Sequence, residues 1–110
     1  ITLTGGEPFL QPTQALVLAR FARQGGLSVW CYTGYLYDAE LLSDSRARCE
    51  HTDEMLSLID VMVDGEFVQE LYDISLQFRG SSNQRIIDVP KSLATGEVVA
   101  YRPKSGKIDM

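Results

Sequence analysis

The sequence is poor in cysteine. Cys31 and Cys49 are its two cysteines among 110 residues. Two cysteines are too few for a disulfide framework, and these two lack the close spacing of a metal site. Cys31 lies in the apolar and aromatic stretch VWCYTG, which predicts a buried small hydrophobe, whereas Cys49 in a polar stretch predicts a free surface thiol.

Basic residues and long apolar runs are also scarce. Lysine and arginine number 10 against 15 aspartates and glutamates, giving a net charge of -5. Binding along a phosphate backbone needs a basic surface, so the composition argues against nucleic acid as a direct ligand. No apolar run approaches the roughly 20 residues that span a bilayer, and no stretch has the order of a signal peptide. We therefore expect a cytoplasmic protein without a membrane contact.

The sequence does contain alternating strand and helix signals in a length that suits one domain, 1–110. The opening ITLT alternates apolar and polar residues like a short strand, and two glycines end it. Apolar residues then recur at helical spacing from Pro12 to the glycine pair at 25–26. Further strands are predicted within 27–35, at 61–63 and at 85–89, with helical segments after Asp38, at 53–59, at 67–72 and at 91–94.

This alternation predicts an α/β fold with a parallel sheet built of βα repeats. In such sheets ligands bind at the carboxyl ends of the strands. Three successive predicted strands end in TGGEP, YTGY and DGEF. We expect these three turns to lie side by side on one rim.

The first of these turns has the chemistry to bind an amino-acid group. Glycines at 5 and 6 let the backbone approach a ligand closely, and Glu7 offers a carboxylate to an ammonium group. Peptide N–H groups in such a turn can also bind a carboxylate. The alternative interpretation is a plain turn with a solvated glutamate.

The other polar residues of the rim are less specific. Asp64 could accept a hydrogen bond from a hydroxyl group of a ligand or make a second contact with its ammonium group. The alternative is a turn aspartate paired with Gly65. Thr33 and Tyr35 could supply hydroxyls, although both residue types are common at strand ends. The polar segment FRGSSNQ before the last strand is interpreted as a solvated loop.

Four segments together resemble a known family. ITLTGGEPFLQP, VWCYTGY, VMVDGEFV and FRGSSNQRIIDVP resemble the activating proteins of anaerobic ribonucleoside-triphosphate reductase, in the radical S-adenosylmethionine superfamily. The resemblance spans nearly the whole chain, and RGSSNQR is its most specific part. It implies a partial radical-SAM (β/α)6-type barrel truncated at its N-terminus. It also implies that Gly5, Gly6 and Glu7 hold the methionine end of S-adenosylmethionine, with Thr33 and Asp64 completing the cofactor-binding residues.

The resemblance also implies an activity. Family members bind a [4Fe-4S] cluster through a Cys-x3-Cys-x2-Cys loop and cleave S-adenosylmethionine to a 5′-deoxyadenosyl radical. This radical removes a hydrogen atom from a glycine of the partner, here the anaerobic reductase. An electron donor such as flavodoxin is a further implied partner.

The sequence departs from the family in two places. The three-cysteine loop precedes GGEP in the family, and neither Cys31 nor Cys49 can replace it. We therefore expect Ile1 to be a cut within a longer protein, with the cluster ligands upstream and this piece inactive alone. Some related enzymes also have Asp-x-Lys where this chain has Asp64-Gly65-Glu66.

Two alternatives to the activase remain open. One is a noncatalytic α/β binding or interaction module, in which GGE and DG are turns only. The other is a radical S-adenosylmethionine enzyme that acts on a small molecule. A Cys-x3-Cys-x2-Cys loop upstream of Ile1 would distinguish the activase from the noncatalytic module. An assay with the partner would distinguish it from the small-molecule enzyme.

Overall fold

The computed structural model is an α/β fold, and it describes residues 1–4, 6–42, 48, 50–73, 75–76 and 78–102. In this part of the chain the strands are β1 (Thr2–Leu3), β2 (Trp30–Tyr32), β3 (Val61–Asp64) and β4 (Arg85–Asp88). The α-helices are α1 (Pro12–Gln24), α2 (Thr52–Leu58) and α3 (Val89–Thr95). Short 3-10 helices cover Pro8–Leu10 and Gln69–Leu71, and a π-helix covers Tyr37–Leu42. The predicted strands and main helices are confirmed within a few residues.

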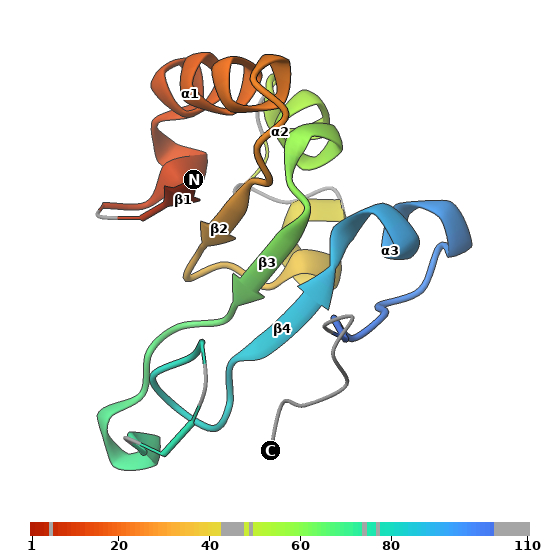
Figure 1. Ribbon diagram of the computed structural model, residues 1–110. Helices are drawn as coiled ribbons and strands as arrows, with labels where there is room; N and C mark the ends of the chain where they lie inside the picture. Colours follow the sequence, from red (N-terminus) through yellow and green to blue (C-terminus); the bar gives the residue numbers. More distant parts are fainter. Residues whose placement is uncertain (5, 43–47, 49, 74, 77, 103–110) are drawn as a thin grey trace.

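The strands form one sheet in the order β1-β2-β3-β4 (Figure 1). The first three strands are parallel, with Cys31 of β2 opposite Met62 of β3. β4 runs antiparallel to β3 and sets Arg85 opposite Asp64. The predicted parallel sheet is therefore confirmed for three strands and wrong for the fourth. The described residues between β3 and β4 contain no α-helix to carry the chain back across the sheet, so β4 starts at the end where β3 stops.

The sheet formed by the described residues is open. β1 lies at one edge, and beyond β4 there is a single bridge between Ile87 and Ala100. The structure thus establishes a mixed four-stranded sheet with helices. Closure into a barrel stays a prediction.

One face of the sheet packs on the helices. Alternate strand residues enter this core, namely Leu3, Cys31, Met62 and Ile87. Four residues of α1 complete it from the helix side, Ala15, Leu16, Ala19 and Ala22. These side chains are mostly small, so α1 can approach the strands closely. Cys31 is confirmed as a buried small hydrophobe.

The other face of the sheet is covered by aromatic rings. The ring centroid of Trp30 lies 5.1 Å from that of Phe78 and 5.4 Å from that of Tyr101. Beneath this face Val61 and Val63 are also buried. β3 is therefore covered on both sides, which explains its continuous apolar run.

The segment that follows β2 differs from the predicted helix. The helix predicted to begin near Ala39 is instead a π-helix that begins at Tyr37, so Asp38 lies inside it rather than before it. The polar stretch at 43–52, whose composition predicts a loop before the helical segment at 53–59, falls largely on residues outside the described part, as does Cys49. Within the described part, no helix has the length and apolar character needed to cross a membrane.

Candidate functional site

The site is built from the turn after β1. Gly6 has φ +62, a left-handed conformation that favours glycine, and a Cβ there would meet Gln11 Nε2 at 3.3 Å. Glu7 follows as the N-cap of the short helix Pro8–Leu10, and its Oε2 accepts a hydrogen bond from Phe9 N at 3.1 Å. Gly6 and Glu7 thus form a turn that holds the carboxylate in a fixed position. Gly5 lies outside the described residues.

The Glu7 carboxylate joins this turn to the turn after β2. Thr33 Oγ1 donates to Glu7 Oε2 at 2.8 Å, and Gly34 N donates to Oε1 at 2.7 Å. Thr33 is itself buried, and its hydroxyl accepts from Tyr35 N at 3.1 Å. Two of the predicted site residues, Glu7 and Thr33, are therefore brought into direct contact.

The turn after β3 joins the same rim. Gly65 N donates to Tyr35 O at 3.0 Å, which links the third turn to the second. Gly65 has φ +96, so the turn after Asp64 requires the freedom of glycine at this position. The three turns that the sequence predicted on one rim thus form a connected hydrogen-bonded edge.

Asp64, the last residue of β3, is buried beside this edge. Its side chain is 0% exposed. Arg85 Nε donates to its Oδ1 at 3.0 Å, while Arg85 Nη2 and Tyr37 N donate to Oδ2 at 2.5 and 2.8 Å. The carboxylate is thus engaged within the chain, and a cofactor contact of Asp64 stays a prediction.

Arg85 also forms an ion pair with a second carboxylate. Its Nη2 donates to Asp38 Oδ1 at 2.8 Å, so one guanidinium ties β3 to the π-helix. The hydrogen bond from Arg85 lowers the pKa of Asp38, and the two carboxylates raise the pKa of Arg85. The sequence did not indicate Arg85 as a site residue, because its position opposite Asp64 depends on the antiparallel register of β4.

The segment RGSSNQ braces the third turn from outside. Gln84 is 9% exposed and donates through Nε2 to Gly65 O at 3.0 Å. Its Oε1 accepts from Gly80 N at 2.9 Å and from Ser81 N at 3.2 Å. Asn83 Nδ2 donates to Glu66 O at 2.8 Å. The interpretation of this segment as a merely solvated loop was wrong for Ser81 and Gln84, which are buried.

The rim fits the ammonium group of an amino acid. A carboxylate offers about four lone-pair positions. Glu7 uses two on Oε2 and, within the described part of the chain, one on Oε1. Half-buried Glu7 therefore retains acceptor capacity on Oε1, beside a glycine turn in which a side chain would be crowded. These are the features expected where an ammonium-bearing ligand approaches the backbone.

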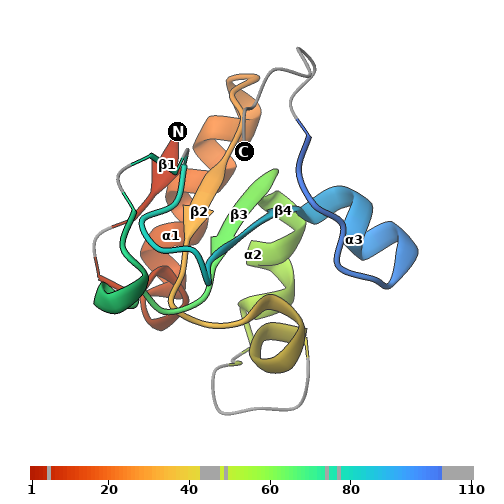
Figure 2. The ribbon, with the colours of Figure 1, turned by 90° about the horizontal axis from the view of Figure 1, so that it is seen from below.

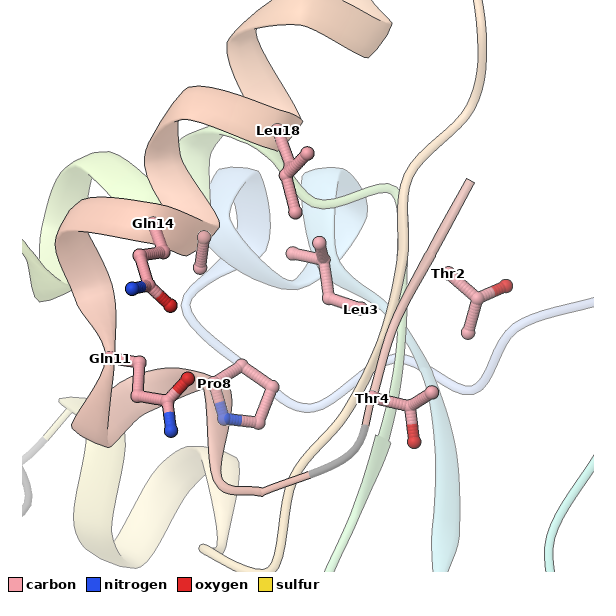
Figure 3. Close-up of a pocket in the computed structure, with 8 residues that line it drawn as sticks. Thr2, Leu3, Thr4, Pro8, Gln11, Gln14 and Leu18 are labelled. Atoms are coloured by element: carbon pink, nitrogen blue, oxygen red, sulfur yellow. The ribbon is translucent and has the colours of Figure 1, made fainter.

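Two cavities lie near this edge. One of about 120 Å³ separates β1 from α1 and includes Leu3, Pro8 and Leu18 in its lining. Figure 3 shows Leu3 and Leu18 directed toward each other across it, with Thr2 and Thr4 on the other side of β1. The other, of about 300 Å³, lies along β4 and is lined by Arg79, Arg85, Ile86, Ile87, Val98, Ala100 and Tyr101. The first is too small for a nucleoside-sized ligand.

The described residues do not fit an iron–sulfur cluster. A [4Fe-4S] cluster is held by cysteine thiolates, and Cys31 is 0% exposed on the helix-covered face of β2. Burial and, to a smaller extent, the Glu7 charge raise the pKa of its thiol, which disfavours the thiolate. Within the described part of the chain, no three His, Cys, Asp or Glu side chains gather as a metal site.

Comparisons with known proteins show which family the chain belongs to. A family model described as a 4Fe-4S single cluster domain matches residues 1–87. The chain is 41% identical over 91 residues to the anaerobic ribonucleoside-triphosphate reductase-activating protein of Pasteurella multocida, a match that covers 78% of this chain and 53% of that protein. The protein of the same name from Escherichia coli is 42% identical over 89 residues, covering 76% and 52%. The one from Enterobacteria phage T4 is 33% identical over 94 residues, covering 78% and 51%.

The matches cover only part of each relative. The chain spans about half the length of the curated relatives it matches. No solved structure matches it.

Proposed function

Because the chain belongs to the 4Fe-4S single cluster domain family and its curated relatives are named anaerobic ribonucleoside-triphosphate reductase-activating proteins, we propose that it is part of a radical S-adenosylmethionine activase of such a reductase. The observation that carries this proposal is the connected rim around Glu7. Its fixed carboxylate and glycine turn suit the amino-acid end of S-adenosylmethionine.

In the proposed activity of the whole protein, one electron would break the S–C5′ bond of S-adenosylmethionine and give methionine and a 5′-deoxyadenosyl radical. This radical would take a hydrogen atom from a glycine of the reductase, leaving 5′-deoxyadenosine and a glycyl radical. A [4Fe-4S] cluster would supply the electron, held by cysteines outside the described residues and reduced by a donor such as flavodoxin. The described residues have no thiolates for this cluster, so their part is to bind and orient the cofactor.

Each rim residue has a separate part in the proposed binding. Glu7 Oε1 accepts a hydrogen bond from the ammonium group of the cofactor. The backbone at Gly5 and Gly6 approaches the carboxylate of the cofactor. Thr33 holds Glu7 in place through the 2.8 Å hydrogen bond to Oε2. Asp64 supports the rim through Arg85 and would contact the cofactor only by exchanging one of its internal bonds.

We further propose that residues 1–110 are one partial radical S-adenosylmethionine domain of a cytoplasmic protein. Its sheet would belong to a (β/α)6-type barrel. The edge position of β1 within the described sheet supports this, because a preceding strand could pair there.

The proposed function is tested with the full-length protein and the reductase under anaerobic conditions. With S-adenosylmethionine and a reductant, we expect 5′-deoxyadenosine and a glycyl radical doublet in the electron paramagnetic resonance spectrum of the reductase. A reductase with alanine in place of the radical glycine is the control and should give no doublet. Cofactor cleavage without any radical on the wild-type reductase would favour the small-molecule enzyme and overturn the proposal.

A further inference from the structure

The segment between β3 and β4 exposes several large apolar side chains. Four large side chains in it are 42–52% exposed, and we call them the loop surface: Phe67, Leu71, Tyr72 and Phe78. The ring centroids of Phe67 and Tyr72 lie 6.0 Å apart, so these two side chains form one patch rather than isolated exposures. Gathered apolar side chains of this kind mark interaction sites on soluble proteins.

This segment is held in place by its own hydrogen bonds. Ser82 N donates to Leu71 O at 3.0 Å, and Asp73 N donates to Gly80 O at 3.2 Å, as in a short hairpin. Ser81 is fully buried and its hydroxyl accepts from Val68 N at 3.2 Å. The apolar side chains therefore project from a fixed backbone, which lowers the entropic cost of binding a partner.

Phe78 is fixed by a strained conformation. Its φ of +68 is an outlier for a bulky residue, of the kind that surrounding structure must impose. Tyr32 Oη donates to Phe78 O at 2.5 Å, and the Phe78 ring lies against Trp30. The loop surface is thus anchored on β2, the strand that leads to Thr33 of the rim.

The loop surface adjoins the candidate site. The segment begins at Gly65, which is bonded to Tyr35 of the rim, and returns through Gln84, which is bonded to Gly65. Figure 1 shows it extending beyond the carboxyl ends of β2 and β3. In Figure 2, seen from below, it lies away from α3 and near the strand ends. A protein bound there would lie next to the rim.

The charge around the loop surface is negative. Glu66, Glu70 and Asp73 are exposed, and within the described residues none of these carboxylates has an ion-pair partner. The one cation of this stretch, Arg79, donates to Gln84 O at 2.8 Å. Such a surface attracts a partner with basic side chains and repels an acidic one.

We propose that the loop surface is the docking site for the reductase. It would bind a segment that combines apolar and basic side chains and lies beside the radical glycine. This inference rests on the proposed function, since abstraction of a hydrogen atom requires the glycine to enter the site. Phe67 and Tyr72 are the contacts that bind most strongly, because a few aromatic side chains carry most of the energy of an interface. Glu70 favours the correct partner by its charge.

The test uses full-length protein and measures two quantities. One is the affinity for the reductase, and the other is the release of 5′-deoxyadenosine without the reductase. The double variant Phe67→Ala/Tyr72→Ala should bind the reductase about ten- to hundredfold more weakly, the loss of two aromatic contacts. Cofactor cleavage without the reductase should stay at the wild-type rate, because the loop surface has no part in it. The glycyl radical yield should fall at low reductase concentration and recover at high concentration.

A matched control separates this surface from exposed apolar residues in general. Phe21 and Leu10 lie on or before α1 and are 73% and 67% exposed. Phe21→Ala/Leu10→Ala should leave the affinity for the reductase unchanged. Similarly, Glu70→Lys should weaken binding at low salt, whereas Glu97→Lys after α3 should not.

Three outcomes would overturn the proposal. Unchanged reductase affinity in Phe67→Ala/Tyr72→Ala, with normal radical formation, refutes the docking site and leaves the proposed function standing. Loss of reductase-independent cofactor cleavage in the same variant means that the segment has a structural role instead. Failure of the wild-type protein to form any radical on the reductase removes the proposed function, and the docking site falls with it.

Discussion

At the scale of single residues, Glu7 shows how a short motif fixes the position of a carboxylate. Its side chain caps the helix Pro8–Leu10 and accepts from two groups of the next turn, so it is held in one orientation before any ligand arrives. The sequence indicated Glu7 as a candidate because it follows a predicted strand and two glycines, although this pattern also fits a plain turn. Its bonds to Thr33 and Gly34 were not evident from the sequence, since they depend on how two distant turns meet.

Arg85 offers a residue-scale comparison between two carboxylates. It is paired with Asp64, whose side chain is 0% exposed, and with Asp38, whose side chain is 50% exposed. Asp64→Asn leaves a buried polar cluster without its charge and should cost about 3 kcal/mol. Asp38→Asn removes a solvated pair and should cost less than about 1 kcal/mol. Urea denaturation of the full-length variants measures both changes in the free energy of unfolding. Equal losses in the two variants would contradict the prediction.

The same comparison has a pH dependence. The pKa of Asp38 is lowered in the folded protein by Arg85. Its stabilising contribution is therefore present above the ordinary aspartate pKa of about 3.9 and is lost as the pH falls through the lowered folded value. Asp38→Asn should accordingly make the unfolding free energy less sensitive to acid in that window.

At the scale of elements, the periodic parts of the chain were predictable and the connection between β3 and β4 was not. The stripe of small residues identifies α1, and the apolar run VMV identifies β3, because these patterns reflect local burial. The antiparallel direction of β4 follows from a connection that contains no α-helix in the described residues and is held by side chains. Gln84 Nε2 donates to Gly65 O, and Ser81 Oγ accepts from Val68 N. Such side-chain to backbone bonds leave no periodic signal in a sequence.

The hydrogen bonds of Gln84 yield an element-scale prediction. Gln84→Met keeps the size of the side chain but leaves the carbonyl of Gly65 and the N–H groups of Gly80 and Ser81 without their partner. Each such buried group costs about 1–3 kcal/mol if unpaired. We expect amide hydrogen exchange at Gly80 and Ser81 to become faster, with α1 unchanged. Ser82→Ala, at an exposed position of the same segment, is the control, and equal exchange in both variants would refute this role of Gln84.

At the scale of the whole molecule, the sheet brings the three turns together and leaves the chemistry incomplete. Parallel β1, β2 and β3 deliver their carboxyl ends to one edge, as the sequence predicted. The described residues supply a binding rim but no thiolates for a cluster. The chain spans about half the length of its curated relatives. In the proposed function, Glu7 and its rim orient the cofactor, and cysteines outside the described residues would hold the cluster.

Equilibrium binding of S-adenosylmethionine to the cluster-loaded full-length protein, wild type against Glu7→Gln, tests this assignment most directly. Glutamine keeps the shape but removes the charge, so the loss of a charge-assisted contact of roughly 1.5–3 kcal/mol should weaken binding about ten- to hundredfold. Glu97→Gln, a charge loss remote from the rim, should bind normally, and iron content should be the same in all three proteins. Equal affinities for wild type and Glu7→Gln would mean that Glu7 only shapes the turn, and the proposed cofactor site would be wrong.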